Sequence, residues 1–127
     1  MTKTELQNYR HIVQRIRQLK AEREELIRLV KAPDGMPKGG EKTDPTADAG
    51  GRLADIAAEI DDELTKLREE RSRITAVLST LPPKERNLMY YHYILGLSWE
   101  KVAVEMHFNY RWVMRLHIRA LRRIAEK

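Results

Sequence analysis

Apolar residues in the first quarter of the chain recur every three or four positions, which is the spacing of an amphipathic helix. The pattern predicts one helix over residues 2–31, which ends at Ala32-Pro33-Asp34-Gly35. Arg23 occupies one position of the apolar seam, so the seam has a polar interruption. The apolar members of this predicted seam are Tyr9, Ile12, Ile16, Leu19, Leu26 and Val30.

The same spacing predicts a second long helix from Leu53 to the stop at Leu81-Pro82-Pro83. Residues 32–51, between the two helices, hold five of the six glycines and three of the five prolines, which predicts a flexible loop. A helix that began at Asp44-Pro45 would have to include Gly50-Gly51 at about 1 kcal/mol each, so we expect fraying until Arg52. The seam of the second helix is predicted as Leu53, Ala57, Ile60, Leu64, Leu67, Arg71, Ile74, Leu78 and Leu81.

Three shorter helices are predicted after the double proline. The first presents Leu88, Tyr91 and Leu95 on one face and closes at Gly96. Ser98 is the N-cap of the second, which is about two turns long. A turn at His107-Phe108-Asn109 follows, and His107 stands where a positive φ is expected. The inward residues of the second and third helices are predicted as Val102, Ala103, Met106, Val113, Leu116, Ala120, Leu121 and Ile124.

A short helix, a tight turn and a longer basic helix are typical of a helix-turn-helix. The predicted fold class is therefore all-α, with an antiparallel, coiled-coil-like hairpin followed by a three-helix module. Residues 1–81 form the hairpin with its loop at 32–51, and residues 82–127 form the helix-turn-helix domain. A single pair of helices leaves much of each apolar seam exposed to solvent, so the hairpin is expected to form a homodimer. The alternative is that the hairpin packs against the C-terminal segment of the same chain.

Positive charge is concentrated at the two ends of the chain. Residues 82–127 carry 9 basic and 4 acidic groups and residues 1–31 carry 8 and 4, out of 24 and 19 in the whole chain. The last predicted helix contains no acid over thirteen residues. An arginine stripe opposite an apolar face suits a helix in the major groove of double-stranded DNA, although a solvated helix end is also basic. Its arginines are Arg111, Arg115, Arg119, Arg122 and Arg123.

Composition and motifs argue against several other classes. The chain has no cysteine, which excludes disulfides, thiolate metal sites and a cysteine nucleophile. It has no G-x-S-x-G, Walker loop or H-E-x-x-H motif, and its four histidines share no metal-ligand spacing, so we expect no enzyme, cofactor or metal. No apolar run reaches the ~18–20 residues of a membrane span and no signal peptide is evident, so a soluble, cytoplasmic protein is expected.

The segment LPPKERNLMYYHYILGLSWEKVAVEMHFNYRWVMRLHIRALRRI resembles region four of bacterial sigma factors. That pattern runs LPxRER, an apolar helix, GLSxxEIA, a short turn, and a helix ending RALxKL. The whole chain is similar to small phage-encoded regulators of the ArpU and RinA type, which have sigma-like helix-turn-helix ends. The resemblance implies a sequence-specific transcriptional regulator in a bacterial host cytoplasm.

Carried over by position, the resemblance places base-reading sites at Tyr110, Arg111 and Arg115, with Tyr110 toward the core side of its helix. It places backbone contacts at Trp112, Met114 and Arg119, although Trp112 and Met114 stand where the family often has polar or basic residues. The full candidate DNA-binding set is Ser98, Asn109, Tyr110, Arg111, Trp112, Met114, Arg115, Arg119 and Arg122.

Two other functions are compatible with the predicted helix-turn-helix. A phage small terminase subunit also joins DNA-binding helices to a coiled-coil oligomer, but it forms rings with many subunits. An adaptor that docks on RNA polymerase without touching DNA is the other alternative, and the arginine stripe disfavours it.

Overall fold

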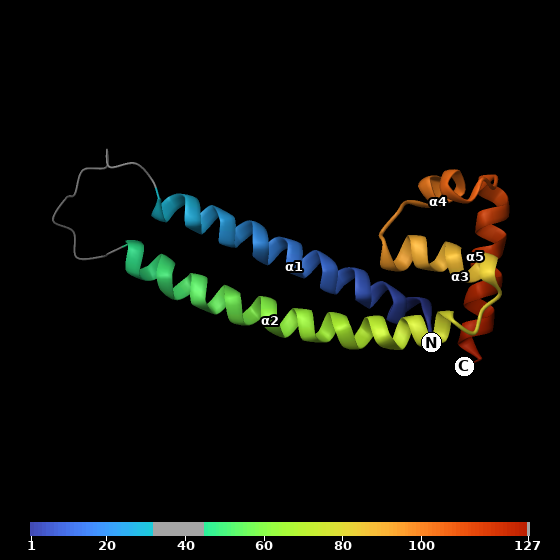
Figure 1. Cartoon of the computed structure of the whole chain (residues 1–127), viewed down its shortest axis with the longest axis horizontal. Coiled ribbons are helices and arrows are strands. Elements are labelled where there is room, and N and C mark those ends of the chain that lie inside the picture. Colours follow the sequence, from blue (N-terminus) through green and yellow to red (C-terminus); the bar gives the residue numbers. More distant parts are fainter. Residues whose placement is uncertain (32–44, 127) are drawn as a thin grey trace. The chain divides into compact units, whose positions relative to one another are not determined.

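The computed structural model describes residues 1–31 and 45–126, and all regular structure in these ranges is helical (Figure 1). The predicted all-α fold class is therefore confirmed. The elements are α1 (Lys3–Val30), α2 (Pro45–Leu78), α3 (Pro83–Met89), the π-helical segment η1 (Tyr90–Ile94), α4 (Trp99–Met106) and α5 (Tyr110–Ala125).

The chain divides into two compact units, and each is described by itself. Unit 1 comprises Met1–Val13 and Lys66–Lys127, and unit 2 comprises Gln14–Thr65. Helices α1 and α2 each contribute one segment to each unit. The predicted loop at 32–51 falls partly outside the described residues, since nothing is described between 31 and 45.

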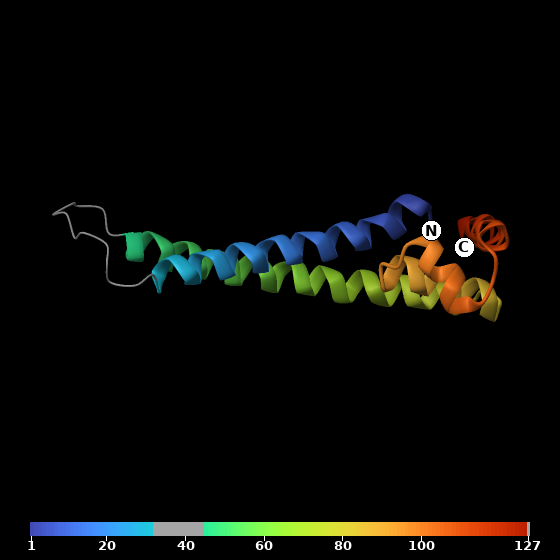
Figure 2. The same ribbon diagram turned by 90° about the horizontal axis from the view of Figure 1, so that it is seen from above.

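Unit 2 is an antiparallel pair of helix segments that run side by side (Figure 2). Arg15 pairs with Glu59, and Glu22, further along α1, pairs with Arg52, earlier in α2. Arg52 makes two contacts with Glu22, of 2.8 and 3.0 Å, and one of 3.1 Å with Glu59. The hydrogen bonds from Arg52 hold the pKa of the Glu22 carboxyl below its ordinary value. This ion-pair network favours one register of the two helices.

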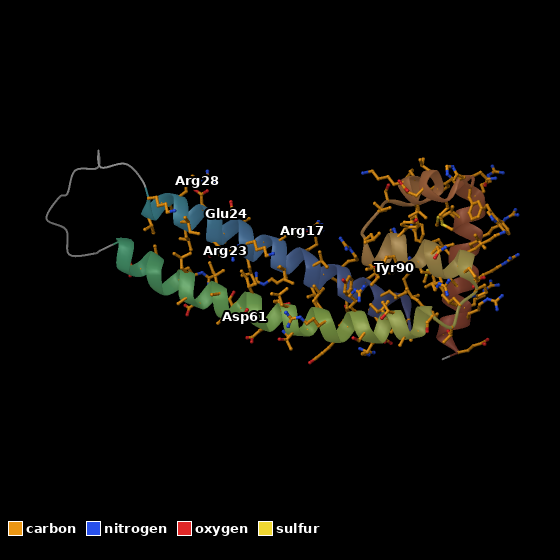
Figure 3. All side chains as sticks on the ribbon, in the orientation of Figure 1. Arg17, Arg23, Glu24, Arg28, Asp61 and Tyr90 are labelled. Carbon is orange, nitrogen blue, oxygen red and sulfur yellow. The ribbon has the colours of Figure 1, made fainter. Side chains whose placement is uncertain are left out.

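The apolar core of unit 2 is small. Leu19, Ile56 and Ile60 are buried together, with Leu26 and Leu64 packed against them. The polar interruption predicted at Arg23 lies on the side of α1 that faces α2 and is half-buried, whereas Arg17 and Arg28 lie on the outer side (Figure 3).

The expected start of α2 is wrong. The helix begins at Pro45 and passes through Gly50 and Gly51, so it does not fray until Arg52. A buried Ala49 and a buried Ile56, on either side of the glycines, offset the roughly 2 kcal/mol that two glycines cost.

The predicted seam also errs at two positions of α2. Ala57 and Arg71 are exposed, and Ile56 is buried in place of Ala57. A seam that alternates strictly by three and four drifts from the true helical period, and the larger apolar side chain gains more by burial.

The core of unit 1 draws on both ends of the chain. Leu6 and Tyr9 of α1 and Ile74 and Leu78 of α2 pack in one cluster with the C-terminal helices. Leu6 is fully buried, although the predicted seam begins only at Tyr9. The C-terminal members of the cluster are Leu81, Leu88, Met89, Tyr93, Ile94, Val102, Ala103, Val113, Leu116, Ala120 and Ile124.

The predicted face Leu88, Tyr91 and Leu95 is wrong in its last member, because Leu95 is 51% exposed. Regular α-helix ends at Met89 and η1 continues the helix with wider π-helical turns. The extra residue per turn shifts every later side chain around the axis. Tyr93 and Ile94 therefore become buried and Tyr91 only half-buried.

Gly96 closes this helix, as predicted, with a left-handed φ of +76°. Arg10 of α1 approaches the same point, and its Nη1 donates a 3.1 Å hydrogen bond to the Ile94 carbonyl oxygen. A Cβ on residue 96 would overlap this guanidinium. The left-handed backbone angle is therefore what requires the glycine, because a Cβ there would displace only the movable end of the Arg10 side chain.

Leu6→Ala is expected to destabilise the protein by about 2–5 kcal/mol, because it removes a fully buried side chain from the core of unit 1. Gln7→Ala, at an exposed neighbouring position, is the matched control and should change little. Chemical denaturation followed by circular dichroism measures both. Equal stability of the two variants would contradict the shared core.

Candidate nucleic-acid interface

A helix-turn-helix is formed by α4, the turn 107–109 and α5 (Figure 1). The Ser98 hydroxyl oxygen accepts a 3.3 Å hydrogen bond from the Lys101 N–H at the start of α4. Asn109 Oδ1 accepts one of 2.8 Å from the Trp112 N–H at the start of α5. Both candidate DNA-contact residues Ser98 and Asn109 are thus N-caps, which satisfy backbone donors that the helix leaves open.

The turn between the helices has the conformation that the sequence predicted. His107 takes a left-handed φ of 58° and ends α4. Phe108 packs against the core of unit 1, and the Lys84 ammonium lies 5.7 Å from the centre of its ring. The inward residues of α4 are Val102 and Ala103, which are buried, and Met106, which is half-buried.

Helix α5 has one buried face and one charged face. Val113, Leu116, Ala120 and Ile124 are buried as predicted, and Leu121 is half-buried. On the opposite face, four exposed residues follow one another at intervals of four, three and four, which places them in one line along the helix. This line, which we name the outer ridge, consists of Arg111, Arg115, Ile118 and Arg122.

Three further residues of the candidate set stand beside the outer ridge. The Arg119 guanidinium lies over the Trp112 ring, 5.4 Å from its centre. This cation–π contact holds Arg119 along the helix surface and gives Trp112 a role in positioning that arginine. Met114 is half-buried on the other side of the ridge.

The expectation that Tyr110 faces the core is wrong. Tyr110 is 46% exposed and lines a surface hollow of about 400 Å³ at the start of α5. It is the first residue of the helix, beyond the buried face that begins at Val113. The other residues that line the hollow are Asn109, Arg111, Trp112 and Arg115.

Arg123 differs from the other four arginines, because it pairs with a buried carboxylate. Its Nε donates a 3.3 Å hydrogen bond to Oε1 of Glu85. The same Nε lies 3.0 Å from Oε2 of Glu85 and forms an ion pair with it, but the geometry of this second contact is not that of a hydrogen bond. Glu85 is buried in the first turn of α3, where the helix dipole also favours its charge. This pair ties α5 to α3, which makes Arg123 a structural residue.

The sequence patterns did not predict a cluster of aromatic and histidine rings on the buried side of α5. Tyr93 Oη and His117 Nε2 share a 2.7 Å hydrogen bond, and the His92 ring stacks on Trp99 with 3.8 Å between centres. The His92 Nδ1–H donates to the Leu97 carbonyl oxygen at 2.7 Å. His117 follows Leu116 on the buried face of α5, and this position was the only sequence signal for its burial.

Burial sets the protonation states in this cluster. Burial and, to a smaller extent, the positive charge of Lys3 together lower the pKa of His117 to about 4. Burial also lowers the pKa of His92 and raises the pKa of Tyr93 to about 12. Both imidazoles are therefore neutral and the phenol keeps its proton near pH 7.

The exposed face of α5 offers positive charge and hydrogen-bond donors. Within residues 1–31 and 45–126, no three histidine or acidic side chains are grouped so that they could hold a metal ion. None of the helices described has the length and apolar character needed to cross a membrane.

Comparison with known families gives one match. The model described as "Protein of unknown function (DUF722)" matches residues 6–126, which is nearly the whole chain. The chain belongs to the DUF722 family. No curated protein and no solved structure gave a significant match to this DUF722 chain.

The DUF722 chain is expected to lose stability as the pH falls from about 6.5 to about 4. In this range the unfolded state protonates His117 but the folded state does not, because its folded pKa is about 4. The loss from this residue is at most on the order of 3 kcal/mol. Urea denaturation at several pH values measures it.

His117→Gln keeps a polar partner for Tyr93 but cannot titrate, so its stability should fall less steeply over the same pH range. His11→Gln, at an exposed histidine of α1, is the matched control and should keep the full acid dependence. A slope unchanged by His117→Gln would show that other groups cause the acid sensitivity.

Proposed function

We propose that this protein binds double-stranded DNA sequence-specifically through α5 and acts as a transcriptional regulator. The observation that carries the proposal is the exposed arginine face of α5, which follows a short helix and a tight turn and lies opposite a fully buried face. A helix in the major groove needs cationic side chains toward both phosphate backbones and donors toward the base edges. The resemblance to sigma region four and to phage regulators of the ArpU and RinA type points the same way.

The arginines divide into two proposed roles. Arg111 and Arg115 stand in the first half of α5 and line the hollow at its start, so we assign them to base edges, where arginine can bind guanine through two hydrogen bonds. Arg119 and Arg122 stand further along and are assigned to the phosphate backbone. Arg123 is left out of the interface because Glu85 holds it.

Binding to a duplex selected from a random library is expected to weaken steeply with salt. About four phosphate contacts, two of them from Arg119 and Arg122, predict a slope near −4 in log K against log salt. Arg122→Ala should reduce this slope by about one and weaken all sequences alike, whereas Arg115→Ala should cost about 1–3 kcal/mol and relax preference at one base pair.

Fluorescence anisotropy over a salt series measures both effects. Arg28→Ala, at an exposed arginine of unit 2, is the control and should leave binding unchanged. An affinity that stays constant between low and physiological salt would refute DNA binding by this helix.

We also propose that a second copy packs on unit 2 and makes the regulator a dimer. The support is the thin core of this unit and the exposed apolar side chains at the end of α1, which are Ile27, Leu29 and Val30. Leu19 is already buried within one chain and Leu67 packs in unit 1, so neither side chain is assigned to the contact between subunits. A two-fold dimer would read two half-sites about one helical turn of DNA apart.

Light scattering at tens of micromolar is expected to give the mass of a dimer. Ile27→Glu combined with Leu29→Glu should give a monomer, because burial of two added charges between subunits is unfavourable. Val104→Glu, at an exposed apolar position of unit 1, is the control and should remain dimeric. A monomeric unmutated protein would refute the dimer, and a ring of eight or more subunits would favour the terminase function.

A further inference from the structure

The outer ridge of α5 contains one residue that phosphate binding does not explain. Ile118 lies between Arg115 and Arg122 on the exposed line of the helix and is 49% exposed. It is opposite the buried face and is not part of the core of unit 1. A ridge that served only the phosphate backbone would gain nothing from an aliphatic side chain among its arginines.

The chemistry of the major groove supplies a partner for such a side chain. Among the base edges exposed there, the 5-methyl group of thymine is the apolar one, and aliphatic side chains contact it. Burying one methyl-sized group is worth about 0.8 kcal/mol, which corresponds to about a four-fold change in affinity. An isoleucine on the groove side of the helix would therefore discriminate between base pairs without any hydrogen bond.

The spacing along α5 relates this contact to the proposed arginine contacts. Ile118 follows Arg115 by three residues, a rise of about 4.5 Å along the helix. This is close to the separation of about 3.4 Å between successive nucleotides of a strand. A thymine read by Ile118 would thus lie next to the base pair that Arg115 reads.

We propose that Ile118 is a specificity-determining residue that contacts the 5-methyl group of one thymine in the DNA site. The inference rests on the proposed function, because it needs α5 in the major groove. It adds to that function a preference for thymine beside an arginine-read base pair. It also distinguishes the outer ridge from a general polyanion-binding surface.

The test removes the methyl group from the DNA and the aliphatic group from the protein. A duplex is selected from a random library with the unmutated chain, and each thymine is then replaced in turn by uracil, which lacks only the 5-methyl group. One replacement should weaken binding about four-fold. Ile118→Ala should weaken binding to the thymine duplex by a similar factor and should be insensitive to that same replacement, since the two changes remove one contact.

Two control variants make the result specific. Ile118→Val keeps a branched aliphatic side chain and should keep most of the sensitivity to uracil. Leu95→Ala removes an aliphatic side chain that is 51% exposed and lies outside the proposed DNA-binding and dimer surfaces, and it should leave the whole uracil profile unchanged. Circular dichroism checks that Ile118→Ala is folded, as expected for an exposed position where alanine favours helix.

The outcomes separate the inference from the proposed function. Salt-sensitive binding to the selected duplex, with a uracil effect that is absent or equally large in Ile118→Ala, would overturn the role of Ile118 and leave DNA binding intact. Failure to select any duplex would overturn the proposed function and the inference together. Loss of a dimer in Ile118→Ala would assign the side chain to a protein contact and also overturn the inference.

Discussion

The apolar core of unit 1 is the constraint on which the helix-turn-helix depends. It joins Leu6 and Tyr9, near one end of the chain, to Ile124, near the other. The Met1 backbone nitrogen also donates a 3.0 Å hydrogen bond to the Ile124 carbonyl oxygen. Helix α5 is therefore held by the first turns of α1 as well as by the helices next to it in sequence, and the start of the hairpin is structurally part of the helix-turn-helix unit.

Polar contacts complete this core and fix the orientation of α5. Glu85 holds Arg123, and the hydrogen bond between Tyr93 and His117 joins η1 to the buried side of the same helix. Arg10 binds the carbonyl end of η1 at the point where Gly96 leaves room for it. A buried carboxylate or imidazole is costly without a partner, so these contacts favour one position of α5 over others. A fixed α5 is what direct reading of base edges would require.

Unit 2 has a much smaller apolar core than unit 1. Unit 2 has few buried apolar side chains, and ion pairs among Arg15, Glu22, Arg52 and Glu59 set the register of its helices. Exposed pairs of this kind contribute little to stability in water. The small apolar core of unit 2 is the physical basis for the proposed second copy on that unit.

Local patterns along the chain determined the helical class, both long helices, the N-cap at Ser98, the left-handed His107 and the buried face of α5. These features follow from helical periodicity and from side chains that bind their own backbone, and both act within a few residues. The tertiary structure alone decided the π-helical turn that buries Tyr93 and exposes Leu95, the path of α2 through Gly50 and Gly51, and the pairing of Glu85 with Arg123. Each of these depends on the free energy of burying a side chain against a segment distant in sequence, and no local pattern records which segment that is.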